Sequence, residues 1–286
     1  MDSTTDKTAP NHETVTQHET VTGPETTARA SALPLPLTAL MPALGVFLLV
    51  TFLAAGALGV LQGSTAIPTE VIQLTQFGPA IGVLAVAVGW RSRVRESLAG
   101  AFRAAGRVGA RGPLLLATAP LIIAAAAIAY GLLTGDARLT PPSALDNPFA
   151  VIVVAQLIGA CGEEIGWRCF LQPLLRRRFS ALTSSIVVGV LWGVWHVQVL
   201  AQAPVYAVAF LLATTSMSVV LGLALDRVRA HRLLLAGGFH TLINLGLLLC
   251  MDEETGAVLP MVLLGASCLV AAALWIWRAP TTRTTT

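Results

Sequence analysis

The residues whose types could do chemistry lie in apolar stretches of this sequence, where charged side chains are costly. Segment 162–168, which reads GEEIGWR, carries Glu163, Glu164 and Arg168 within an apolar run that begins at Pro148. A charge at the centre of a membrane helix costs about 2.5 to 3.5 kcal/mol on insertion-derived scales. These three charges therefore need partners or a function.

Helical spacing indicates how the three charges divide. Each residue of an α-helix turns by about 100°, so Glu164 and Arg168, four residues apart, share a face and can form an ion pair. Glu163 lies one step around the helix, without that partner. We therefore predict that Glu164 and Arg168 hold each other while Glu163 faces a site. A buried charge cluster that only fixes helix packing is the alternative at this point.

Two further helices are expected to bring histidines towards Glu163. Trp192 and His196 are four residues apart in one apolar segment, and His240 and Asn244 are four apart in another. Each pair therefore lies on one helical face. Glycines four residues apart, at 162 and 166 and at 189 and 193, give faces that let these helices approach closely. The pattern predicts one site built from three helices.

A carboxylate and two imidazoles can support hydrolysis in two ways. Glu163, His196 and His240 are the ligand set of a catalytic zinc that keeps one position for water. Without a metal, Glu163 and His196 would hold and deprotonate a water. His240 and Asn244 would then donate hydrogen bonds to the oxyanion of a tetrahedral intermediate. The residues leave both versions open.

The elements that must position these residues are membrane helices. The chain has 286 residues, of which 55% are hydrophobic and 12% charged, whereas a soluble domain carries about a quarter charged residues. We predict an all-α, polytopic membrane protein, a bundle of about eight transmembrane helices. The apolar windows lie at about 39–61, 70–90, 114–134, 148–172, 183–203, 205–225, 232–250 and 256–277.

The chain divides by composition into three parts. Residues 1–36 are polar and predict a disordered cytoplasmic tail. Residues 37–278 form the transmembrane helical domain, with its motif core at 148–250, and residues 279–286 a short polar C-terminal tail. Sixteen of the eighteen Lys and Arg residues fall in the tails and in alternate loops. By the positive-inside rule, both termini are expected to be cytoplasmic.

Three motifs in order resemble those of the CAAX protease and bacteriocin-processing family, intramembrane endopeptidases that include the type II CAAX prenyl proteases. The motifs are Glu163-Glu164-x-x-x-Arg168, Trp192-x-x-x-His196 and His240-x-x-x-Asn244. The resemblance implies a membrane core of about eight helices and peptide-bond hydrolysis within the membrane. It also implies four working residues, Glu163, His196, His240 and Asn244, and three supporting ones, Glu164, Arg168 and Trp192.

The sequence as a whole predicts a hydrolase that acts as an intramembrane endopeptidase, either a metalloprotease or a glutamate-dependent enzyme. Its cofactor is a divalent metal such as zinc, or none. The expected partners are the lipid bilayer and a membrane-associated or lipidated peptide or protein substrate, with no nucleic acid. The expected location is the bacterial plasma membrane. A catalytically silent scaffold or bacteriocin-immunity protein, and an ion-coupled transporter, are the alternatives.

Overall fold

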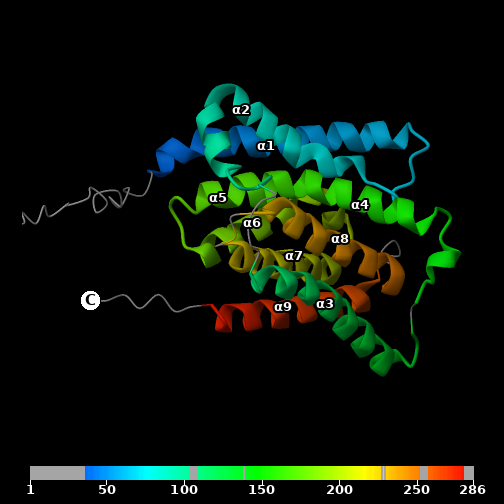
Figure 1. Ribbon diagram of the computed structural model, residues 1–286. Helices are drawn as coiled ribbons and strands as arrows, with labels where there is room; N and C mark the ends of the chain where they lie inside the picture. The colour runs from blue at the N-terminus through cyan, green and yellow to red at the C-terminus, as the bar shows by residue number, and fades with distance from the viewer. Residues whose placement is uncertain are drawn as a thin grey trace, which may run out of the picture. The chain divides into compact units, whose positions relative to one another are not determined.

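The computed structural model describes residues 36–103, 109–137, 139–226, 228, 230–251 and 257–279. Within these ranges the chain is helical and contains no strand (Figure 1). The predicted tails at 1–36 and 279–286 lie outside the described residues, apart from Pro36 and Ala279. The prediction of an all-α membrane protein is confirmed.

Each predicted window overlaps one main helix or helical run. The main helices are α1 (Leu37–Gly63), α2 (Gly78–Ser97), α3 (Arg111–Thr134), α4 (Phe149–Glu164), α6 (Ala181–Trp195), α7 (Pro204–Leu225), α8 (Arg232–Cys250) and α9 (Val258–Trp277). The run that starts with α4 continues through a π-helical segment, Ile165–Leu171, into the short α5 (Gln172–Leu175). The motif core therefore carries a break in α-helical periodicity.

Among the described residues, six helical runs are long and apolar enough to cross a membrane. The other two are α6, which has 15 residues, and α2. The window predicted at 70–90 is displaced, because α2 begins at the Gly78-Pro79 pair and runs on into Arg91, Arg93 and Arg95. Its charged second half bends away from α-helical geometry at Trp90. The predicted count of about eight transmembrane helices is therefore approximate, with six full-length spans among the described residues.

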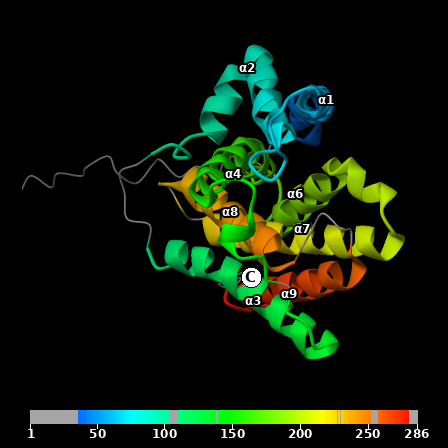
Figure 2. The same cartoon turned by 90° about the vertical axis from the view of Figure 1, so that its right-hand side faces the viewer.

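Packing places α4 and α8 next to each other, between the α1–α2 pair and the α3–α9 pair (Figure 2). Helix α6 packs on α7, and α7 packs on α9. The π-helical segment lies against α2, and here a Cβ at Gly166 would fall 2.4 Å from the Cβ of Pro79. The motif core is thus enclosed by neighbouring helices, and Gly166 is required for close contact with α2.

Gly189 has the same role where α6 meets α7. A Cβ there would fall 2.6 Å from Thr215 Cα and 2.7 Å from Ser218 Cβ, which belong to the facing helix. We expect Gly189→Ala to lower the free energy of unfolding by about 1 to 3 kcal/mol, because an added methyl forces the backbones apart. Thermal unfolding in detergent measures this. Gly45→Ala, which meets nothing within 4 Å, is the matched control, and equal melting temperatures for the two variants would contradict the prediction.

Candidate active site

The carboxylate of Glu163 is buried at the end of α4 and is held by a tryptophan from α6. Trp192 Nε1 donates a hydrogen bond of 2.8 Å to Glu163 Oε2. Both side chains are buried, with Glu163 at 2% exposure. Because the indole takes one carboxylate oxygen, Oε1 is the oxygen left to face a ligand.

Glu164 connects the π-helical segment to α8. Its Oε2 lies 3.4 Å from Arg168 Nε, as the i,i+4 spacing predicts, and its Oε1 lies 3.0 Å from His240 Nδ1. The Arg168 guanidinium also stacks on Trp192, with Cζ 4.5 Å from the ring centroid. A buried carboxylate is thus shared by a guanidinium and an imidazole, and this arrangement fixes three helical runs relative to one another.

His196 lies just past the end of α6. The window at 183–203 predicted it within a helix, which is wrong by one residue: the helix ends at Trp195, and His196 has ψ 65°. Its Nδ1 lies 2.8 Å from the carbonyl oxygen of Trp192. A carbonyl can only accept, so Nδ1 carries the hydrogen, and Nε2 of the neutral ring is an unprotonated acceptor.

Asn244 lies one turn after His240 on α8 and is held by a residue that the motifs did not include. Asn244 Nδ2 donates to Gln156 Oε1 at 3.0 Å, and Gln156 Nε2 donates to the carbonyl oxygen of Glu70 at 3.1 Å. Gln156 is buried on α4, seven residues before Glu163. Since seven residues are about two helical turns, the shared face of Gln156 and Glu163 was the signal in the sequence.

These side chains line one cavity of about 620 Å³. The predicted residues on its wall are Glu163, Trp192, His196, His240 and Asn244. Glu164 and Arg168 support it from behind. A second cavity of about 520 Å³ shares Glu163 and His196 and extends along the small residues Ala55, Gly56 and Gly59 of α1. The acid and one imidazole therefore lie where two cavities meet.

The fit of this set to a metal can be judged from its geometry. Across the ranges that the structure describes, no group of three or more His, Cys, Asp or Glu side chains is placed to hold a metal ion. Partners on one oxygen of Glu163 and on Nδ1 of both imidazoles leave Oε1 and the two Nε2 atoms for a ligand, an arrangement that metal-binding histidines also show. The zinc ligand set of Glu163, His196 and His240 therefore stays a prediction, and no step is derived through a metal.

Comparisons with known proteins agree with the motifs. Residues 145–246 match the family model of the Rce1-like type II CAAX prenyl endopeptidases. Lysostaphin resistance protein A of Staphylococcus haemolyticus is 23% identical over 232 residues, which are 81% of this chain and 63% of that protein. The Staphylococcus epidermidis protein is 23% identical over 232 residues, 81% of this chain and 60% of its own.

The Staphylococcus aureus protein of strain MRSA252 is 25% identical over 138 residues, 48% of this chain and 33% of that protein. The chain therefore spans less than two thirds of the length of these relatives. The segment that matches the family model contains all three motifs. The similarity of this chain to the CAAX protease and bacteriocin-processing family, with its type II CAAX prenyl endopeptidases, is thereby confirmed.

Proposed function

We propose that the chain is an intramembrane endopeptidase that hydrolyses a peptide bond of a membrane-associated or lipidated peptide or protein. The observation that carries the proposal is the single cavity onto which Glu163, His196 and His240 open from three different helical runs. The family match supports the reaction class. An ion-coupled transporter and a silent scaffold have no comparable support.

Water activation is the first step of the proposed reaction. Among the described residues, Oε1 of Glu163 and Nε2 of His196 accept no hydrogen bond, so both can bind a water in the cavity. A water between them would lose its proton to Glu163 while its oxygen bonds to the carbonyl carbon of the substrate. The proton then passes to the amine as the carbon–nitrogen bond breaks, so the water is consumed and the base is regenerated.

Oxyanion stabilisation is the second part. His240 donates through Nδ1 to Glu164, and a carboxylate is the partner that balances an imidazolium, which then offers Nε2–H to the cavity. Asn244 has two amide hydrogens, of which one goes to Gln156. The other is free to donate beside His240. Two fixed donors at a tetrahedral oxyanion are the arrangement that lowers the barrier to acyl transfer.

Gln156 is a positioning residue in this proposal. We expect Gln156→Ala to lower kcat by about tenfold, the equivalent of one lost hydrogen bond of about 1.4 kcal/mol, because the Asn244 amide is no longer oriented. Steady-state cleavage measurements would show the loss in kcat with little change in KM. Gln156→Glu keeps an acceptor for Asn244 and should recover part of the rate, whereas equal losses in both variants would contradict positioning.

The cavity opens at one end of the helical bundle. Its polar rim comes from three connections, between α1 and α2, between α3 and α4, and between α6 and α7, and includes Glu70, Thr140 and Gln198. Described arginines such as Arg91, in the second half of α2, and Arg176, directly after α5, belong to the opposite ends of these helices, whose course Figure 1 shows. With those arginines cytoplasmic by the positive-inside rule, the substrate enters from the non-cytoplasmic side.

A cleavage screen with metal analysis tests the proposed function. The wild type is purified into lipid nanodiscs, its metal content is measured, and peptides with an apolar anchor are added. Cleavage by metal-free protein supports the glutamate-dependent version, and cleavage that needs a stoichiometric metal supports the metalloprotease version. A protein that cleaves nothing, and whose biological effect survives in a folded Glu163→Ala, His240→Ala variant, would be a scaffold.

A further inference from the structure

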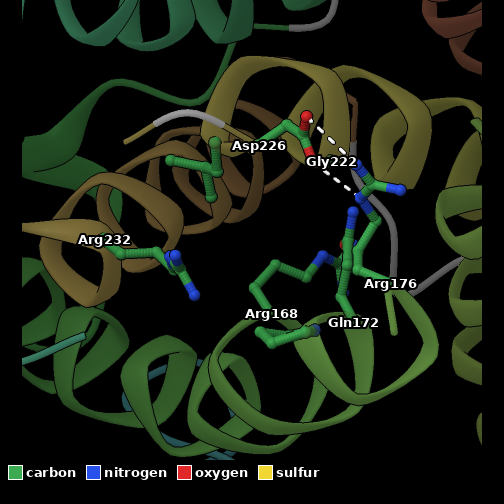
Figure 3. Close-up of a pocket in the computed structure, with 8 residues that line it drawn as sticks. Arg168, Gln172, Arg176, Gly222, Asp226 and Arg232 are labelled. Atoms are coloured by element: carbon green, nitrogen blue, oxygen red, sulfur yellow. Dashed lines mark hydrogen bonds and ion pairs between the residues drawn. The ribbon is translucent and has the colours of Figure 1, made fainter. Parts of the chain in front are cut away.

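A separate cavity of about 250 Å³ lies at the arginine-rich end of the bundle, between the end of the π-helical segment, α7 and α8 (Figure 3). It shares no lining residue with the proposed active-site cavity. Its lining contains three arginines and one acid: Arg168, Arg176, Arg232 and Asp226. The cavity is the size of a small anion with its water and is too small for a peptide.

The buried guanidinium of Arg168 has donors that find no acceptor among the described residues around this cavity. The residue is 2% exposed, and Nε, Nη1 and Nη2 make no hydrogen bond to any part of the chain that the structure describes. Within the described part of the chain, its one carboxylate contact is the ion pair with Glu164 at 3.4 Å. Leaving a buried charged donor without an acceptor is costly, so the Nη groups are suited to an acceptor that the chain itself does not provide.

The charges around the cavity favour an anion. Arg176 is already paired with Asp226, with Nε 2.7 Å from Oδ1, as the dashed lines in Figure 3 mark. The remaining two lining arginines, Arg168 and Arg232, therefore have no lining carboxylate of their own among the described residues. Arg232 Nε is buried without a hydrogen-bond partner, and only its Nη2 donates, to the carbonyl oxygen of Val228.

The start of α8 adds to this field. Arg232 is the first residue of this 19-residue helix, and the preceding His231 has a left-handed backbone (φ 54°) and makes no side-chain capping bond. A helix N-terminus carries a partial positive charge and amide hydrogens that point outward. The positive end of α8 therefore lies beside Arg232 and adds to the positive charge of the two arginines, although the amide of Leu233 is bonded to the carbonyl oxygen of Ala101.

We propose that this cavity, which we call the arginine pocket, binds a phosphate group through Arg168 and Arg232. Guanidinium groups match phosphate oxygens in geometry and charge better than any other side chain. The phosphate is either free inorganic phosphate or the headgroup of a phospholipid, since the pocket lies at the end of the bundle where headgroups would be. The proposal does not depend on the proposed proteolysis.

Thermal unfolding with and without phosphate tests the arginine pocket. The purified protein in a neutral detergent is melted in sodium phosphate and in sodium chloride of equal ionic strength. It is then melted in nanodiscs of phosphatidylcholine alone and with phosphatidylglycerol added. Arg232→Gln removes one phosphate ligand, and Arg178→Gln, which changes an exposed arginine outside the pocket, is the matched control. Arg232→Lys keeps the charge without the planar fork.

The expected result is a rise in melting temperature of about 3 °C for the wild type and Arg178→Gln, and about none for Arg232→Gln, with Arg232→Lys between them. A rise with inorganic phosphate assigns the free anion, and a rise only with phosphatidylglycerol assigns the lipid. A wild type that responds to neither, or an equal response in Arg232→Gln and Arg178→Gln, overturns the proposal. The wild-type comparison alone decides it if Arg232→Gln does not fold.

Discussion

Replacing Glu163 by glutamine is expected to lower peptide cleavage by about a hundred- to ten-thousand-fold, the range that general-base catalysis contributes. The amide can still accept the hydrogen bond from Trp192 Nε1, which lies 2.8 Å from Oε2 in the native protein. The wall of the cavity is therefore retained, but no group at this position can take a proton. Single-turnover cleavage in nanodiscs, with a peptide that the wild type cleaves, measures the loss.

Glu96→Gln is the control for this loss. It makes the same chemical change at an exposed residue of α2 whose carboxylate pairs with Arg177 at 3.0 Å. Cleavage should then stay within about twofold of the wild type, since a surface ion pair is worth little. If Glu163→Gln retained wild-type cleavage, Glu163 would not be the general base. The role that the family resemblance implies for this residue would then be wrong.

Much of this fold follows from properties that are local in sequence. Apolar windows predict the helices because each needs about 20 residues to cross the hydrocarbon, and those windows hold α1 to α9. The i,i+4 rule places Glu164 beside Arg168, which lie 3.4 Å apart. The i,i+4 rule holds here although the π-helical segment begins at Ile165, because the side chains of Glu164 and Arg168 are both buried in the same place.

Contacts between helices could not be predicted in this way. Spacing left Glu163 without a partner and paired Glu164 with Arg168 alone, whereas the structure adds Trp192 to the first and His240 to the second. These bonds depend on how α4, α6 and α8 are rotated against one another, and close packing limits that rotation, as where a Cβ at Gly237 of α8 would fall 2.5 Å from Cys161 Sγ of α4. No periodicity within one helix contains this information.

The exact end of α6 was also beyond the sequence pattern. The apolar run continues past His196 through Val197, Val199 and Leu200, so hydropathy gives no reason to stop there. In the structure, the backbone leaves the α-helix at His196 and continues as a 3₁₀ turn, Val197–Ala201. The imidazole therefore lies at a helix end, where its Nδ1 can reach the carbonyl oxygen of Trp192.

Glu164→Ala is expected to destabilise the fold by about 3 to 5 kcal/mol, more than any other single change at the site, because it leaves a buried charge without its partner. The carboxylate is fully buried and is the one that Arg168 and His240 share. Without it, the Arg168 guanidinium, 2% exposed, loses the one ion pair that it makes with the described residues and keeps its stacking on Trp192. Thermal unfolding in detergent should show a fall of about 2 to 4 °C for each kcal/mol.

A partial replacement separates charge from hydrogen bonding at Glu164. Glu164→Gln keeps an acceptor for His240 Nδ1, now 3.0 Å from Oε1, but removes the charge that balances the guanidinium. Its melting temperature should therefore fall between those of the wild type and Glu164→Ala, and cleavage should drop in both because an imidazolium at His240 loses its counter-charge. Unchanged stability in Glu164→Ala would mean that water or lipid phosphate, rather than this carboxylate, compensates Arg168. If the melting temperature of Glu164→Ala were unchanged and phosphate raised it strongly, a phosphate in the arginine pocket would be the main partner of the Arg168 guanidinium.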